Sequence, residues 1–251
     1  MYGLKNMYSL GLYDCKNLTN VSELKNIHTL ILHNCDEVSD VSALGNIYEL
    51  TLFNCSKITD VSKLGNVHTL KLKHCINIID VSALENIHTL DLFCCLNIKN
   101  ASVLGNVHTL NLSCCMNIKD VNVYKNVHEL SIVDCEYITD VSELGNVHTL
   151  KLKYCNNITD VSALGNVHTL DLFCCSNVTD VSALGNVHTL KLIGCAQIRD
   201  VSALGNIHTL DLCCCLNVTD VSALGNVHKL IMTNNMKNIK GVKKLKNIMW
   251  R

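Results

Sequence analysis

The stretch that decides the fold reads Asn166-Val167-His168-Thr169-Leu170-Asp171-Leu172-Phe173-Cys174-Cys175-Ser176-Asn177-Val178-Thr179-Asp180-Val181-Ser182-Ala183-Leu184-Gly185. It is one copy of a unit of twenty residues, and the sequence lines up with itself at that period from Leu10 to Leu230 without a gap. A fixed period of this size indicates a solenoid, because one such unit cannot bury its own apolar side and must stack on its neighbours.

Each unit begins with a predicted strand. Leu170 and Leu172 alternate with Thr169, Asp171 and Phe173, and this period of two places the leucines on the buried side. The same Leu-x-Leu pattern recurs along the chain at Leu70/Leu72, Leu90/Leu92, Leu110/Leu112, Leu150/Leu152, Leu190/Leu192 and Leu210/Leu212. Stacked units therefore predict one parallel sheet of short strands.

The rest of the unit is too short for an α-helix. Its apolar residues are spaced by three, which suits short extended or 3₁₀ segments; in the quoted unit they are Cys175, Val178, Val181, Leu184 and Val187. Asp180 before Val-Ser-Ala-Leu predicts an N-cap of one short helical turn. Gly185-Asn186 predicts the turn that leads into the next strand.

The pattern Val-x-x-Leu-x-Leu-x-x-Cys-x-x-Ile/Val resembles the leucine-rich repeat, with Cys where Asn is commoner. The run from Ile158 to Val167 resembles the repeats of internalins and of the related phosphatase-regulatory subunits. The resemblance implies a solenoid arc of α/β type, with a parallel sheet on the concave face and short 3₁₀ or irregular segments on the convex face. Two features depart from it: the unit has twenty residues rather than about twenty-two, and the chain has no proline.

The unbroken period predicts one leucine-rich repeat domain over 1–251, with about twelve repeats. Residues 1–14 form a partial first repeat. Residues 231–251 carry many lysines and predict a polar capping repeat, with a basic docking patch as the alternative. The least regular part is Ala101–Lys125, which predicts either a local change of curvature or simple drift among redundant repeats.

Charge and hydropathy limit the classes of partner. The net charge is −1, which does not favour a general polyanion-binding surface, so no nucleic acid partner is expected. No run of eighteen apolar residues occurs, so no membrane span is expected. The first residues already belong to a partial repeat and show no secretory leader, which predicts a reducing, cytoplasmic location.

Eleven of the sixteen cysteines recur at the repeat period: Cys15, Cys35, Cys55, Cys75, Cys95, Cys115, Cys135, Cys155, Cys175, Cys195 and Cys215. Each stacked repeat forms one rung of the solenoid. Asn235 is expected to occupy the ladder position of Cys in the last full rung. Cys and Asn can replace each other at a small, buried position that bonds to the neighbouring backbone, so we expect a ladder of reduced structural thiols.

Histidines form the most conspicuous column: His28, His68, His88, His108, His128, His148, His168, His188, His208 and His228. A straight row of like residues does not converge on one ion as tetrahedral zinc requires, so we expect a stacked, locally hydrogen-bonded column without metal. Five cysteines lie outside the ladder, namely Cys94, Cys114, Cys174, Cys213 and Cys214, and they are expected to be partly exposed thiols. No cofactor is expected.

The outward strand positions vary while the buried ones do not, so the concave face is the predicted binding surface. Lys151, Asp171, Lys191 and Asp211 alternate in sign and could instead form a charge ladder that sets the register. The outward aromatic residues are candidate hot spots for a protein partner, or they pack against the charge ladder. The predicted binding residues are Phe53, Lys71, Lys73, Asp91, Phe93, Lys151, Lys153, Tyr154, Asp171, Phe173, Lys191 and Asp211.

Catalysis finds no support, because an active site needs one asymmetric constellation and every Ser, His and Asp of the repeat recurs along the chain. We therefore predict a non-catalytic module that binds a protein on its concave face. The alternatives are a regulatory subunit that targets an enzyme such as a phosphatase, and a surface adhesin of the internalin type. The sequence does not predict the oligomeric state.

Overall fold

The computed structural model describes residues 7–251, and the expected partial first repeat therefore lies partly outside the described residues. Within this range the chain alternates β-strands with 3₁₀ helices, at about one of each per repeat. The strands are β1 (Ser9–Tyr13), β2 (Thr29–His33), β3 (Glu49–Phe53), β4 (Thr69–Lys73), β5 (Thr89–Asp91), β6 (Thr109–Asn111), β7 (Glu129–Val133), β8 (Thr149–Lys153), β9 (Thr169–Asp171), β10 (Thr189–Lys191), β11 (Thr209–Asp211), β12 (Lys229–Met232) and β13 (Ile248–Trp250).

The 3₁₀ helices follow the strands on the other side of each repeat. They are η1 (Ser22–Leu24), η2 (Ser42–Leu44), η3 (Ser82–Leu84), η4 (Ala101–Asn106), η5 (Asn122–Tyr124), η6 (Leu144–Asn146), η7 (Ser162–Asn166), η8 (Ser182–Asn186), η9 (Ser202–Leu204), η10 (Ser222–Asn226), η11 (Asn234–Met236) and η12 (Val242–Lys244). No helix in the described part of the chain has the length and apolar character needed to span a bilayer.

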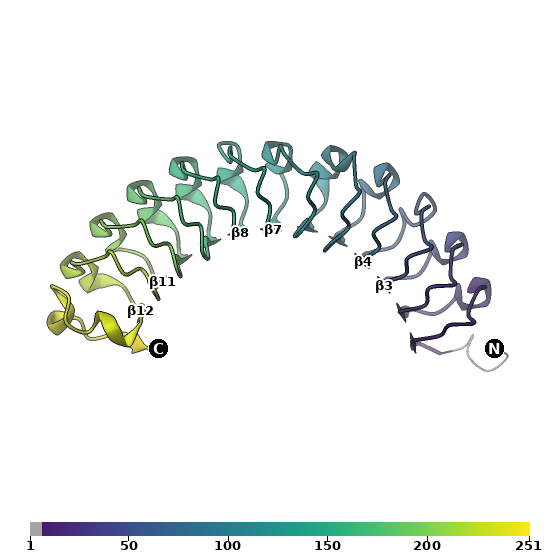
Figure 1. Cartoon of the computed structure of the whole chain (residues 1–251), viewed down its shortest axis with the longest axis horizontal. Coiled ribbons are helices and arrows are strands. Elements are labelled where there is room, and N and C mark those ends of the chain that lie inside the picture. The colour runs from purple at the N-terminus through teal and green to yellow at the C-terminus, as the bar shows by residue number, and fades with distance from the viewer. Residues whose placement is uncertain (1–6) are drawn as a thin grey trace. The chain divides into compact units, whose positions relative to one another are not determined.

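The fold divides into two compact units, one ending at Ile118 and also taking Asn126–His128, the other made of Lys119–Lys125 and Glu129–Arg251. The division falls at the end of the irregular stretch Ala101–Lys125. In the first unit β1 to β6 are parallel and pair in chain order, and in the second β7 to β13 do the same. In each unit the strands line the inner side and the 3₁₀ helices the outer side (Figure 1).

The register repeats the sequence period. Leu150 lies beside Leu170, and Leu170 lies beside Leu190, so that each leucine column runs straight through the sheet. These leucines are fully buried, as are Val178, Val181 and Leu184 of the same unit. The chain is thus a leucine-rich repeat solenoid, and its core is the interior that the stacked repeats share.

The cysteine ladder lies in this core. From Cys35 to Cys215, nearly every ladder thiol donates a hydrogen bond to the carbonyl of the residue 23 positions earlier, for example Cys175 Sγ to Leu152 O at 2.7 Å and Cys215 Sγ to Leu192 O at 2.8 Å. Burial raises the pKa of Cys175 and of Cys215 to about 12, because a thiolate would lose its hydration. The ladder therefore connects adjacent rungs through protonated thiols.

The last rung departs from the expected ladder. Asn235 is exposed, whereas Met236 is buried and fills the core position. Relative to the period of twenty, the last repeat has one extra residue before Ile239. The chain forms η11 at this point instead of the single left-handed residue that precedes each ladder cysteine, so the extra residue falls before the ladder position and Asn235 faces outward. The expectation that Asn235 replaces Cys in the ladder is therefore corrected.

On the outer side, polar side chains form hydrogen bonds both within a rung and between neighbouring rungs. Asp180 Oδ1 accepts a hydrogen bond from Ser182 N at 2.8 Å, and the same contact recurs in most repeats. The residue at the N-cap of η8 is Val181, so the expected N-cap is corrected: Asp180 stands one residue earlier and bonds the first residue of the helix. The side-chain amides of Asn97 and Asn177 donate to carbonyls of the preceding rung, at 2.8 and 2.7 Å. This asparagine ladder was not anticipated from the sequence, although its residues also recur at the period of twenty.

Candidate functional site: the inner strand face

Two matching clusters occupy the strand face, one in each unit. In the first unit Lys73 ends β4, His74 follows it, and Asp91 and Phe93 lie one rung further on. In the second unit the corresponding residues are Lys153, Tyr154, Asp171 and Phe173. We call these the first and second cluster.

The clusters share their hydrogen bonds and ion pairs. Lys73 Nζ lies 3.0 Å from Asp91 Oδ2, and Lys153 Nζ lies 3.0 Å from Asp171 Oδ2. The other carboxylate oxygen of each Asp accepts a backbone hydrogen bond from the Phe two residues on, at 3.0 Å in the first cluster and 3.2 Å in the second. Each aspartate therefore forms an ion pair with a lysine through one carboxylate oxygen and accepts a hydrogen bond from the nearby backbone through the other.

The aromatic rings of the two clusters are arranged alike. The rings of His74 and Phe93 meet edge to face with centroids 5.2 Å apart, and those of Tyr154 and Phe173 do so at 5.1 Å. Lys153 Nζ also lies 5.9 Å from the centre of the Phe173 ring, within range of a cation–π contact. Such packing fixes the side chains before any partner arrives.

The same aspartate contact shortens the strands. β5, β9 and β11 each end at their Asp, because its carboxylate accepts the backbone N–H of the residue two places on and turns the chain. Asn111 acts in the same way at the end of β6, accepting from Ser113 N at 3.0 Å. Among the strands without such a residue, β4 and β8 run for five residues, whereas β10 also ends after three, at Lys191.

Two predicted binding residues are not exposed. Asp171 and Asp211 are 4% and 2% accessible, whereas the sequence placed them on an exposed charge ladder. Their carboxylates bend toward the backbone they cap and are covered by cations. Asp171 contacts Lys153 and, at 3.9 Å, Lys191, while Asp211 lies 3.3 Å from Arg251 Nη1. The two aspartates thus hold other side chains in place.

Lys71, Lys73 and Lys153 pair diagonally with a carboxylate of a neighbouring strand, whereas Lys191 contacts Asp171 along the column. Lys71 lies 2.9 Å from Glu49 Oε1 of the preceding strand, and Asp91 takes Lys73 instead of Lys71. In the described structure Lys151 has no ion pair and is exposed, as is Tyr154. Lys151 and Tyr154 are therefore the two exposed residues of the predicted set.

In the first unit five rings form a continuous strip across the strand ends: Tyr13, His33, Phe53, His74 and Phe93. His33 and Phe53 are stacked with centroids 4.5 Å apart. His74 was missing from the predicted set, although Tyr154 at the equivalent place after β8 was included. The residue at this place is left-handed in most rungs, with φ of 54° at His74 and 56° at Tyr154, and in these two rungs its ring packs against the Phe of the next rung.

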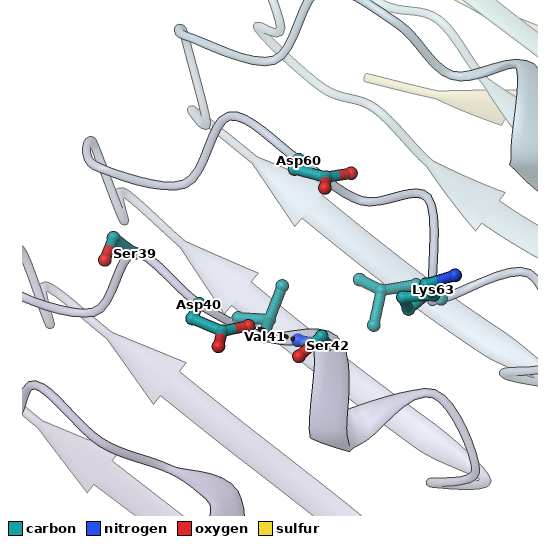
Figure 2. A pocket seen from close by; sticks show the side chains of 7 residues that line it. Ser39, Asp40, Val41, Ser42, Asp60 and Lys63 are labelled. Atoms are coloured by element: carbon teal, nitrogen blue, oxygen red, sulfur yellow. Dashed lines mark hydrogen bonds between the residues drawn. The ribbon is translucent and has the colours of Figure 1, made fainter.

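The outer side has depressions between neighbouring rungs. One is lined by Ser39, Asp40, Ser42, Asp60 and Lys63, with the Asp40 carboxylate tied to Ser42 N at 2.9 Å (Figure 2). Hydrogen bonds from Ser42 and Ser62 hold the pKa values of Asp40 and Asp60 below their usual range. No group of three or more His, Cys, Asp or Glu side chains among residues 7–251 is arranged to hold a metal ion.

The geometry defines the class of protein: a leucine-rich repeat solenoid with a cysteine ladder. Among solved structures, an internalin of Listeria monocytogenes, InlF, matches 98% of this chain and 81% of its own, with a TM-score of 0.67 and 24% identity. This likeness shows the shared fold.

Two further structures match with TM-scores below 0.5. The functional domain of Listeria monocytogenes InlJ, described as including a cysteine ladder, matches 90% of this chain and 68% of its own at 16% identity and a TM-score of 0.40. A leucine-rich repeat protein of Leptospira interrogans matches 91% and 84%, at 18% identity and a TM-score of 0.46. No protein-family model and no curated protein matches the chain.

Proposed function

We propose that the chain is a non-catalytic module that binds a protein partner on its inner strand face. The proposal is carried by the two matching clusters, which present a lysine and an edge-to-face aromatic pair with the same geometry in both units. Aromatic and cationic side chains on a rigid surface are the groups that dominate binding energy in protein interfaces. Leucine-rich repeat folds of this kind commonly present such a surface.

Preorganisation is the physical advantage of this site. Lys153 is held by Asp171 and packs over Phe173, and Tyr154 is fixed against the same ring. Ordering a mobile side chain on binding costs about 0.5–1.5 kcal/mol, and most of that cost is already met in the folded protein. Lys151 and Tyr154 are the groups that a partner would reach first.

We further propose a reducing location for the protein. The ladder works through thiols that donate hydrogen bonds, as Cys175 does to Leu152 O, and this role requires reduced cysteine. Subcellular fractionation tests this location, and recovery of the protein in an exported fraction would contradict it.

The test of the binding face is affinity purification with mass spectrometry on three forms of the chain. These are the wild type, the inner-face variant Lys151→Glu/Tyr154→Ala, and the control Arg199→Glu, which changes an exposed residue on the outer side. We expect the wild type and the control to capture the same proteins and the inner-face variant to lose them. Equal capture by all three forms would reject the inner face. Phosphatase activity that co-purifies with the wild type would instead indicate the regulatory-subunit alternative.

A further inference from the structure

One glycine interrupts the column of left-handed residues that follow the strands. In the second unit this column includes Cys174, Gly194 and Cys214, with φ of 56°, 73° and 61°. Residues with side chains adopt the same conformation in other rungs, as Asn34 and Asn54 do, so the backbone alone does not require glycine at this place. What Gly194 provides is space between two cysteines.

The Cys174 sulfur already leans into this space. A Cβ built on Gly194 would lie 2.8 Å from Cys174 Sγ, so the thiol extends from its own rung over the glycine. Cys174 is partly buried and Cys214 is exposed. We call the open position over Gly194, with a cysteine on either side, the glycine notch. The other cysteines beside the notch are buried: Cys175, Cys195, Cys213 and Cys215.

Backbone hydrogen bonds hold the three rungs of the notch in place. Cys174 N donates to Ile193 O at 2.7 Å, and Gly194 N donates to Cys213 O at 2.9 Å. Adjacent strands of a sheet lie about 4.8 Å apart, so the Cα atoms of Cys174 and Cys214 are about 9.6 Å apart. A disulfide needs a Cα separation of about 7 Å or less. The two thiols therefore do not match a direct sulfur–sulfur bond.

The spacing suits a single ion between the two sulfurs. The Cys214 side chain can reach the notch from the other side by changing its χ1 rotamer. Metal–thiolate bonds are about 2.3 Å long, and two sulfurs that flank one open Cβ position are within that reach of a shared ion. Loss of hydration and, after it, repulsion from Cys214 raise the pKa of the Cys174 thiol, so the two thiols already interact across the notch.

The number and type of ligands select the ion. Thiolates favour soft metals, principally Cu(I), zinc and the iron of iron–sulfur clusters. Zinc and iron–sulfur sites take about four protein ligands, but in the described part of the chain no three His, Cys, Asp or Glu side chains are grouped to hold a metal. Cu(I) accepts two thiolates in a line. It is also the form of copper that a reducing location maintains.

We propose that Cys174 and Cys214 bind one Cu(I) ion across the glycine notch. On binding, each thiol releases its proton to water and each sulfur forms one bond to copper. One Cu(I) and two thiols thus give a bis-thiolate complex with one net negative charge and two free protons. Copper keeps its oxidation state, so no oxidant or reductant takes part, and the chelator or small thiol that carried the ion is released.

Anaerobic competition for Cu(I) with the chelator bicinchoninate measures the affinity for the first ion bound. The proteins compared are the wild type, Cys174→Ser, Cys214→Ser, Gly194→Asn and the control Cys94→Ser/Cys114→Ser, which removes two off-ladder cysteines of the first unit. We expect the wild type and the control to bind equally tightly. Each single cysteine variant should lose at least about 100-fold in affinity, because changing even the partners of metal ligands costs about 10–100-fold.

Gly194→Asn tests the notch itself. It keeps both thiols and fills the open position with a residue that the same column accommodates at Asn34 and Asn54. We expect it to lose about tenfold or more in Cu(I) affinity. If a cysteine variant does not fold, as judged by circular dichroism, this variant decides, and unchanged affinity would reject the site.

Unchanged affinity in either folded cysteine variant, or a loss confined to the control, would overturn the proposal. X-ray absorption of the copper-loaded wild type identifies the ligands directly. We expect two sulfur atoms around Cu(I), and a nitrogen or a third sulfur ligand would reject the two-thiolate assignment.

Discussion

Lys153 Nζ lies 3.0 Å from Asp171 Oδ2, while the other oxygen of the same carboxylate accepts the N–H of Phe173. The aspartate is almost completely buried and the lysine about one-third exposed. One side chain therefore ends strand β9, turns the chain and anchors a cation on the inner face. This relationship connects the fold to the proposed binding site.

Two substitutions of Asp171 separate its hydrogen bond to the backbone from its ion pair with Lys153. Asp171→Ala leaves the Phe173 N–H without its partner, and we expect it to lower the free energy of unfolding by about 1–3 kcal/mol. Asp171→Asn keeps an oxygen at the same place, as Asn111 does for Ser113, and should cost less than about 1 kcal/mol. Urea unfolding followed by circular dichroism measures both values. An equal loss in the two variants would assign the effect to the ion pair.

Glycine at the end of the outer turn is a packing requirement in most rungs. A Cβ built on Gly165 would lie 2.4 Å from the Ala183 carbonyl oxygen of the next rung, whereas one on Gly225 meets nothing within 4 Å. We expect Gly165→Ala to destabilise the protein by about 1–3 kcal/mol, because the neighbouring backbone must move. Gly225→Ala should be neutral or stabilising by up to about 1 kcal/mol.

Thermal unfolding of these two variants provides a matched comparison. Lys25, Glu85 and Lys125 stand at the equivalent place in other rungs, so a neighbouring rung can adjust to a side chain there. That adjustment is why we expect a moderate cost at Gly165 and not a failure to fold. Equal melting temperatures for Gly165→Ala and Gly225→Ala would contradict the steric explanation.

The thiols should differ widely in reactivity. Cys175 is buried and its pKa is raised to about 12, so almost none of it is thiolate at neutral pH. Cys214 is exposed. We expect iodoacetamide to modify Cys214 within minutes and the ladder cysteines only after unfolding, as measured by peptide mass spectrometry. Rapid modification of Cys175 in the native protein would show that the ladder opens readily.

Stability should fall in mild acid because of the stacked histidines of the second unit, among them His168, His188 and His208. Loss of hydration at the ring, followed by repulsion from the neighbouring imidazoles, lowers the pKa of His168 and of His208 below 6.5. Above this value both residues are neutral in the folded and unfolded chain. As the pH falls below it, the unfolded chain takes up protons first, so the folded state loses stability until its own lower pKa is reached.

Melting temperatures between about pH 7.5 and about pH 5.5 test this effect, because the aspartates that cap the turns titrate at lower pH. The hydrogen bonds of Ser182 to Asp180 lower the pKa of that carboxyl, so its contribution changes only in stronger acid. His168→Gln/His208→Gln should reduce the slope. A flat wild-type profile over this range would contradict the expected linkage.

The sequence by itself determined the architecture of the repeat. Its period of twenty, the Leu-x-Leu strands and the apolar residues spaced by three predicted the parallel strands, the 3₁₀ turns and the buried thiols. The structure confirms these features because each depends on contacts that every repeat makes with the next one in the same register. The stacked histidines followed from the same rule.

Only the tertiary structure decided how the polar side chains at the strand ends are oriented and which neighbouring rung they contact. Sequence spacing placed Asp171 and Asp211 in solvent, but capping of the local backbone turned their carboxylates inward, where Lys153 and Arg251 cover them. Asn235 likewise lies outside the ladder, because the last repeat has one extra residue and forms η11 before the core position. A repeat specifies which face a residue belongs to, whereas the direction of its polar atoms depends on the hydrogen bonds available in three dimensions.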